Sequence, residues 1–189
     1  MNWMKKVAVA LVCLLPLGLQ AAKVDTLQVK SPSMNKSIEV VVVSPDVAAT
    51  KACPVIYLLH GYGGNARTWV GIKPDLSKIA DEKGIFFVCP DGKNTWYWDS
   101  PLNADVRYET FISDELVKYV DSHYKTVADR KGRAITGLSM GGHGAMWNGL
   151  RHSDVFSAAG STSGGVDIRP FPKNWEMSVQ IGEKAKYPE

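Results

Sequence analysis

The chain has 189 residues, with 22 lysines and arginines against 19 aspartates and glutamates, which gives a formal net charge of +3. This length is enough for one domain with a hydrophobic core. The near-balanced charge shows no basic stripe, so neither nucleic acid nor an acidic membrane surface is expected as a partner.

The first 22 residues have the pattern of a secretory signal peptide. Residues 1–6 carry two lysines, residues 7–19 are apolar, and small Ala21 and Ala22 follow. About 13 apolar residues fall short of the roughly 20 that span a bilayer, so no stable membrane anchor is expected. Cys13 lies inside the apolar run, which argues against lipidation. We therefore expect export to the periplasm or the medium, with residues 23–189 as the mature domain.

Two cysteines remain after this cleavage, Cys53 and Cys89. Cys53 begins one predicted strand and Cys89 ends another, so in a parallel pair they lie at opposite ends. This separation exceeds the roughly 7 Å between Cα atoms that a disulfide allows. Buried free thiols are expected.

The first half of the chain predicts a hairpin followed by a βαβ unit. Residues 24–29 and 37–43 read as two strands that pair as a hairpin. Residues 54–59 and 84–89 are continuous apolar runs, which are typical of strands buried on both faces. Residues 75–82 between them predict a helix. A parallel sheet with a right-handed crossover follows from this order.

The second half continues the alternation of helices and strands. Apolar residues recur with a 3.6-residue period over 108–124, which predicts a helix that packs on the sheet. A strand at 134–138, a helix at 140–150 and a strand at 155–159 follow, and residues 166–189 show no strong period. The expected fold class is α/β, a mostly parallel sheet with helices on both faces.

The sequence Gly-Leu-Ser-Met-Gly at 137–141 carries the predicted nucleophile, Ser139. It lies between a predicted strand and a predicted helix, where a tight, strained turn needs small flanking residues. Such a turn lifts the hydroxyl clear of the sheet at the positive end of the helix. The alternative is an ordinary serine N-cap.

The sequence His-Gly-Tyr-Gly-Gly at 60–64 ends another buried strand and fits an oxyanion hole. Glycines let backbone N–H groups approach the oxygen of a tetrahedral intermediate without obstruction. We assign the two donors to the amides of Tyr62 and Met140. The alternative is a flexible turn without a catalytic role.

Four segments, LLHGYGG, CPDG, NTWYWDSP and ITGLSMGGHGAMW, together resemble the esterase D family of α/β-hydrolases. That family includes S-formylglutathione hydrolases, feruloyl and acetyl-xylan esterases, tributyrin esterases and mycolyltransferases. The similarity runs from about residue 38 to residue 165. It implies an α/β-hydrolase fold, a serine nucleophile matched by Ser139 and an oxyanion hole matched by Tyr62 and Met140. No metal or organic cofactor is implied.

The family's catalytic aspartate and histidine follow two further strands, so both are expected beyond Glu189. The fold is accordingly expected to lack its C-terminal strands, as a C-terminally incomplete version of a longer enzyme. Asp91 and Asp99 precede the nucleophile, whereas this fold places its acid after it. Asp91 is interpreted as a turn residue.

None of the four histidines is expected to replace the missing base. His143 lies one helical turn after the nucleophile and should point along the helix flank, where it supports the turn. His152, two residues before Asp154, should lie far from the active face. His123 reads as a surface or capping residue at a helix end, and His60 should hold the oxyanion loop through side-chain hydrogen bonds.

Aromatic residues predict part of a substrate site. Trp96 and Trp98 follow the strand that ends near residue 89, at the sheet edge that also carries the nucleophile. With His60 they are candidate substrate-binding residues, and the alternative is that these rings form core. Phe171 and Trp175 are candidates for a small cap over the site.

The sequence therefore predicts an exported serine carboxylesterase that acts through an acyl-enzyme. The expected substrates are short acyl esters or the acetyl and feruloyl groups of plant polysaccharides, since export argues against an intracellular glutathione thioester. Two alternatives stay open. One is an acyltransferase with the same nucleophile, and the other is a non-catalytic remnant that binds esters or glycans.

Overall fold

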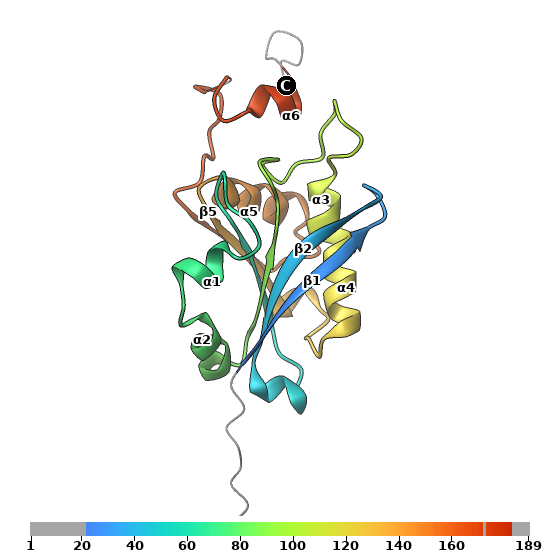
Figure 1. Ribbon diagram of the computed structural model, residues 1–189, viewed down its shortest axis with the longest axis vertical. Coiled ribbons are helices and arrows are strands. Elements are labelled where there is room, and N and C mark those ends of the chain that lie inside the picture. Colours follow the sequence, from blue (N-terminus) through green and yellow to red (C-terminus); the bar gives the residue numbers. More distant parts are fainter. Residues whose placement is uncertain (1–21, 172, 183–189) are drawn as a thin grey trace, which may run out of the picture.

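The computed structural model describes residues 22–171 and 173–182, so the expected signal peptide lies outside the described residues except for Ala22. The described chain forms a six-stranded sheet in the order β1-β2-β4-β3-β5-β6 (Figure 1). The strands are β1 (Lys23–Ser31), β2 (Lys36–Ser44), β3 (Val55–Leu59), β4 (Phe86–Pro90), β5 (Arg133–Leu138) and β6 (Ala158–Thr162).

The sheet is mixed at one side and parallel through the rest. β1 pairs with β2 and β2 with β4 in antiparallel register, so the predicted hairpin is confirmed. β3 pairs in parallel with both β4 and β5, and β5 pairs in parallel with β6. The predicted βαβ unit and the α/β fold class are therefore confirmed.

Helices cover both faces of this sheet, as predicted. The helical segments are η1 (Asp46–Ala49), α1 (Thr68–Ile72), α2 (Leu76–Lys83), α3 (Tyr108–Thr110), η2 (Phe111–Glu115), α4 (Leu116–His123), η3 (Arg130–Gly132), α5 (Met140–Arg151) and α6 (Met177–Ile181). The predicted helix over 108–124 is one run formed by α3, η2 and α4, with a π-helical turn in its middle. The short α1 and α6 were not predicted, because five residues are too few to establish a period.

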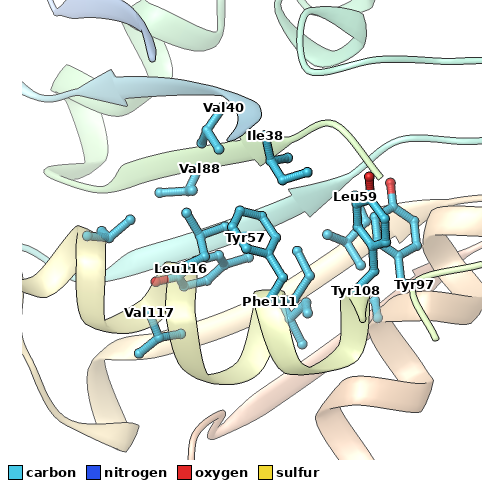
Figure 2. Close-up of a cluster of buried hydrophobic side chains, with 14 of the residues drawn as sticks. Ile38, Val40, Tyr57, Leu59, Val88, Tyr97, Tyr108, Phe111, Leu116 and Val117 are labelled. Atoms are coloured by element: carbon cyan, nitrogen blue, oxygen red, sulfur yellow. The ribbon is translucent and has the colours of Figure 1, made fainter. Parts of the chain in front are cut away.

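Side chains of β3 alternate between two cores, one on each face. Tyr57 and Leu59 join a cluster with residues of α3, η2, α4 and α5, while Leu58 joins a smaller one with Leu76 and Ala80 of α2. Figure 2 shows the larger cluster, in which Tyr57 faces the helical run that follows residue 108. This strict alternation is what a strand buried on both faces requires.

The strand predicted at 155–159 is displaced in the structure. β6 begins at Ala158 and continues to Thr162, into the glycine- and serine-rich stretch expected to be a loop. Phe156 is instead a core residue, with its ring centroid 5.6 Å from that of Tyr57. The two alanines and the glycine of β6 have low intrinsic strand preference, and the strand exists because all five residues pair with β5.

Cys53 and Cys89 are buried as free thiols, as predicted. Within residues 22–171 and 173–182, no helix is long and apolar enough to cross a membrane. The same residues contain no group of three or more histidine, cysteine, aspartate or glutamate side chains placed to hold a metal ion.

Candidate active site

The strand order places a crevice at the carboxyl ends of β3 and β5. From β3 the chain crosses to β4 on one side, and from β4 it returns past β3 to β5 on the other. Loops on either side of such a reversal diverge, and ligands of open α/β sheets bind there. Tyr62 follows β3 and Ser139 follows β5, so both predicted site residues lie at this switch point.

Ser139 adopts a backbone conformation that few side chains tolerate. Its φ of 53° and ψ of −117° lie outside the regions open to most residues other than glycine. It occupies the N-cap position of α5, yet its hydroxyl makes no capping hydrogen bond and contacts no described residue by one. The interpretation of Ser139 as an ordinary N-cap is therefore wrong. The exposed hydroxyl stands at the positive end of a 12-residue helix.

The two glycines of the motif are required by close backbone contacts. A Cβ atom placed on Gly141 would lie 2.2 Å from the carbonyl oxygen of Leu59, and one on Gly137 would lie 2.3 Å from that of Gly141. Backbone atoms on both sides leave no room for a side chain to rotate away. The start of α5 is therefore pressed against the end of β3. This contact fixes residues 137–141, called the nucleophile turn after the predicted role of Ser139, beside residues 60–64, called the oxyanion loop after theirs.

The amides assigned to the oxyanion hole are available. Neither the N–H of Tyr62 nor that of Met140 donates a hydrogen bond to another described residue. A Cβ on Gly61 would lie 3.5 Å from the Cβ of Ser139, so the loop before Tyr62 touches the nucleophile turn. The amide of Ser139 itself is held by the carbonyl of Thr162 at 2.8 Å.

His60 holds the oxyanion loop from beneath, as predicted. Its Nε2 accepts from the amide of Gly92 at 2.9 Å, so its Nδ1 carries the proton and donates to the carbonyl of Gly61 at 2.7 Å. Asp91 is a turn residue, because its carboxylate accepts from the amide and ammonium of Lys93. Burial alone would raise the pKa of Asp91, but hydrogen bonds from neighbours including Lys93 hold it well below its usual range.

A cavity of about 160 Å³ opens above Ser139 and is lined mainly by aromatic and apolar side chains. Its walls are Tyr62, Trp96, Ser139, Met140, Ser163, Gly165, Asp167, Ile168, Phe171, Trp175 and Met177. The sequence did not predict that most of the lining residues after position 160 belong to the site. That stretch has no hydrophobic period from which a helix or strand could be predicted.

The sequence left open whether Trp96 and Trp98 bind substrate or form core, and the structure gives them different positions. Trp96 lines the cavity, whereas Trp98 is 2% exposed and packs against both Trp96 and His143, with ring centroids 5.6 and 5.0 Å away. His60 is 1% exposed and also lies behind the cavity wall. Neither Trp98 nor His60 lines the cavity, so the prediction that they contact substrate directly is wrong. Both side chains instead support the cavity wall from behind.

The segment after β6 contributes to the wall of the cavity, in agreement with the suggestion that Phe171 and Trp175 belong to a small cap. Phe171 and Trp175 line the cavity, with ring centroids 5.8 Å apart. The carbonyl of Trp175 accepts a 3.0 Å hydrogen bond from Nε1 of Trp96. Figure 1 shows α6 beyond the sheet edge at which these loops lie.

None of the four histidines, all of them described, bonds to the Ser139 hydroxyl. His143 donates from Nδ1 to the carbonyl of Gly165 at 2.7 Å, and burial lowers its pKa. His152 lies 2.9 Å from the carboxylate of Glu109, and His123 stacks on a neighbouring tyrosine at the surface. Each histidine thus has a structural partner, and none is held by a hydrogen bond in position to act as base on Ser139.

The strain at Ser139 gives a prediction about stability. Replacing Ser139 by glycine should raise the free energy of unfolding by about 1–2 kcal/mol relative to alanine, because glycine adopts this φ without steric cost. Urea denaturation of Ser139→Gly and Ser139→Ala, followed by tryptophan fluorescence, measures this difference. Equal midpoints would show that the turn is unstrained.

The strand order, the switch point and the strained serine turn before α5 define a protein of the α/β-hydrolase fold. Comparison with known proteins places it further: the chain belongs to the family described as "Putative esterase", whose model matches residues 31–187.

Individual relatives agree with this family. The chain is 31% identical to Esterase MT1326 of Mycobacterium tuberculosis (strain CDC 1551) over 75% of this chain and 32% of that protein. It is 32% identical to the Diacylglycerol acyltransferase/mycolyltransferase Ag85A of Mycobacterium leprae over 76% of this chain and 44% of that protein. A solved ferulic acid esterase superposes with a TM-score of 0.71 at 30% identity, over 88% of this chain and 70% of that one. The chain thus spans less than half of these two curated relatives.

Proposed function

We propose that Ser139 is the nucleophile of a carboxylic-ester hydrolase. The observation that supports this most directly is its unbonded hydroxyl, on a strained turn beside two unengaged amides. Attack on the ester carbonyl would form a tetrahedral intermediate whose oxygen accepts from the amides of Tyr62 and Met140, each worth on the order of 3 kcal/mol of barrier. Collapse releases the alcohol and leaves an acyl-enzyme, which water then hydrolyses.

A general base has to reach Ser139 from outside the described residues. Without one the hydroxyl is a weak nucleophile, and the water that releases the acyl group is also unactivated. A site complete in nucleophile and oxyanion donors but without a base would acylate slowly. If acylation were too slow to observe, the protein would be a non-catalytic remnant that binds esters or glycans without turnover.

We propose short acyl esters, or the acetyl and feruloyl groups of plant polysaccharides, as the substrates. The cavity beside Ser139 is small and its walls include Tyr62, Trp96, Phe171 and Trp175, which suit an acetyl or a flat aryl group. The ferulic acid esterase among the structural relatives supports the second choice.

Transfer to an alcohol is the second candidate reaction, because one relative is named as an acyltransferase. The nucleophile and oxyanion donors would be the same, and only the acceptor in the second step differs. The described residues around Ser139 hold nothing that selects water over an alcohol.

The test is hydrolysis of p-nitrophenyl acetate and methyl ferulate by the 189-residue protein and by any longer form that the gene encodes. Ser139→Ala should abolish the enzyme-dependent rate, while Ser153→Ala, an exposed serine beyond the far end of α5, should leave it unchanged. Added glycerol separates the reactions, because a transferase forms a glyceryl ester and a hydrolase the free acid. Equal rates in wild type and Ser139→Ala would contradict the proposal.

We also propose that the protein is exported. The support is the pattern of charged, apolar and small residues in positions 1–22. N-terminal sequencing of the protein recovered from the periplasm or the medium tests this. A mature N-terminus near residue 23 is expected, whereas an intact Met1 in the cytoplasmic fraction would contradict it.

A further inference from the structure

A second cavity, of about 370 Å³, lies at the same edge of the sheet as Ser139. Its walls come from β1, β2, the loop after β3 and the loop after β4, and all but one of its residues are polar. We call it the polar groove; it is lined by Gln28, Ser37, Ile38, Glu39, Asn65, Arg67, Asp91 and Lys93.

Two loops contribute to both the polar groove and the cavity above Ser139. In the loop after β3, Tyr62 lines the cavity and Asn65 lines the groove. In the loop after β4, Trp96 lines the cavity and Lys93 lines the groove. Three residues of extended chain span at most about 10 Å, so the two sites are neighbours.

A hydrogen bond joins these two loops between the sites. The amide of Gly63 donates to Oδ1 of Asn94 at 2.9 Å. The loops therefore form one fixed ridge, with the apolar cavity on one side and the polar groove on the other. A molecule bound across the ridge would place an apolar part near Ser139 and a polar part in the groove.

The charges of the groove favour a neutral ligand over an anion. Its two cations, Arg67 and Lys93, are matched by the two carboxylates of Glu39 and Asp91. Lys93 is already paired with Asp91 at 2.6 Å, and Arg67 donates to the hydroxyl of Thr26 at 3.0 Å. A phosphate group would therefore meet a carboxylate as well as a cation.

The remaining groups of the groove suit a ligand rich in hydroxyls. Sites for ordinary small molecules are mostly apolar, and this one is not. The amides of Gln28 and Asn65 offer donors and acceptors, Glu39 offers acceptors, and Arg67 offers further donors. Each sugar hydroxyl both donates and accepts, so it can pair with every one of these groups.

We propose that the polar groove binds a neutral glycosyl unit, the alcohol half of the ester, while the cavity above Ser139 holds the acyl half. This assignment rests on the proposed esterase function for its catalytic meaning. Binding of the sugar itself needs neither the Ser139 hydroxyl nor a base, so it is measurable on its own.

The experiment is an NMR titration of the ¹⁵N-labelled 189-residue protein with unesterified xylotetraose and cellotetraose, and separately with inorganic phosphate. The amides of Asn65 and Lys93 should shift with at least one of the two sugars. The double variant Glu39→Ala/Arg67→Ala should bind at least about fivefold more weakly, since two polar partners are lost. Lys51→Ala, which removes an exposed cation just before β3, should bind as wild type does.

Three outcomes would overturn the proposal: no shifts with either sugar, shifts with phosphate alone, or equal binding by the double variant. Ser139→Ala should bind the sugars as wild type does, which separates this proposal from the esterase. Sugar binding without Ser139-dependent hydrolysis would contradict the proposed esterase function and support the assignment of the polar groove as a sugar site. Hydrolysis without sugar binding would do the reverse.

Discussion

Replacing Gly141 by alanine should lower the free energy of unfolding by about 3 kcal/mol or more, because the new Cβ would lie 2.2 Å from the carbonyl oxygen of Leu59. The obstacle is backbone, so relief requires α5 to move away from β3. That movement would also carry the amide of Met140 away from the oxyanion position. Ser139-dependent activity should therefore fall together with stability.

The matched control is Gly71→Ala in α1, where nothing lies within 4 Å of the position a Cβ would take. Alanine there should leave stability unchanged or raise it by up to about 1 kcal/mol, as in any exposed helix. Urea denaturation of both variants, monitored by tryptophan fluorescence, gives the comparison. If the two variants unfolded at the same midpoint, the close contact between α5 and β3 would be refuted.

Free imidazole should raise the Ser139-dependent rate of p-nitrophenyl acetate hydrolysis by the 189-residue protein at least about tenfold. A positioned general base is worth about 10²–10⁴ in rate, and no described histidine hydrogen-bonds to Ser139. The Ser139-dependent rate is the rate of wild type minus that of Ser139→Ala under the same conditions. This subtraction removes the hydrolysis that imidazole catalyses in solution.

A different result would assign the base within this chain. If imidazole raised the rates of wild type and Ser139→Ala by the same amount, it would not be acting as a base on the Ser139 hydroxyl. If wild type were already fast without imidazole, His143 would be the first residue to replace. His143→Gln would then have to abolish the activity.

The nucleophile turn and the oxyanion loop were predictable because their glycines stand at a recognisable spacing in the sequence. Gly137 is required within the turn, by the carbonyl of Gly141, whereas Gly141 is required by the carbonyl of Leu59 in β3. The pattern therefore marks the turn even though a distant strand supplies part of the constraint. The same holds for the strands buried on both faces, whose continuous apolar runs mark them without reference to neighbours.

The features that were missed depend on contacts between distant segments. β6 is built from small residues that form a strand only beside β5. The cavity wall draws on Ile168 and Met177, in a stretch without a hydrophobic period. Trp98 was expected in the substrate site because its loop opens there, but the position of Trp96 in front of it is a matter of packing.

The polar groove was invisible in the sequence for a similar reason. Gln28 and Glu39 face each other only through the register of β1 and β2, and Arg67 reaches them only because α1 begins beside β1. Each of these residues alone is an ordinary exposed polar residue. Only the fold brings them to the edge that carries Ser139.

The most direct test of the nucleophile assignment is peptide mass spectrometry after the 189-residue protein has reacted with p-nitrophenyl acetate and been quenched in acid. After a reaction long enough for slow acylation, we predict a stoichiometric acetyl group on Ser139, absent from Ser139→Ala, because no described residue activates the water that would release it. Release of p-nitrophenol at equal rates from both proteins, with no acetyl group on the peptide that contains residue 139, would contradict the assignment.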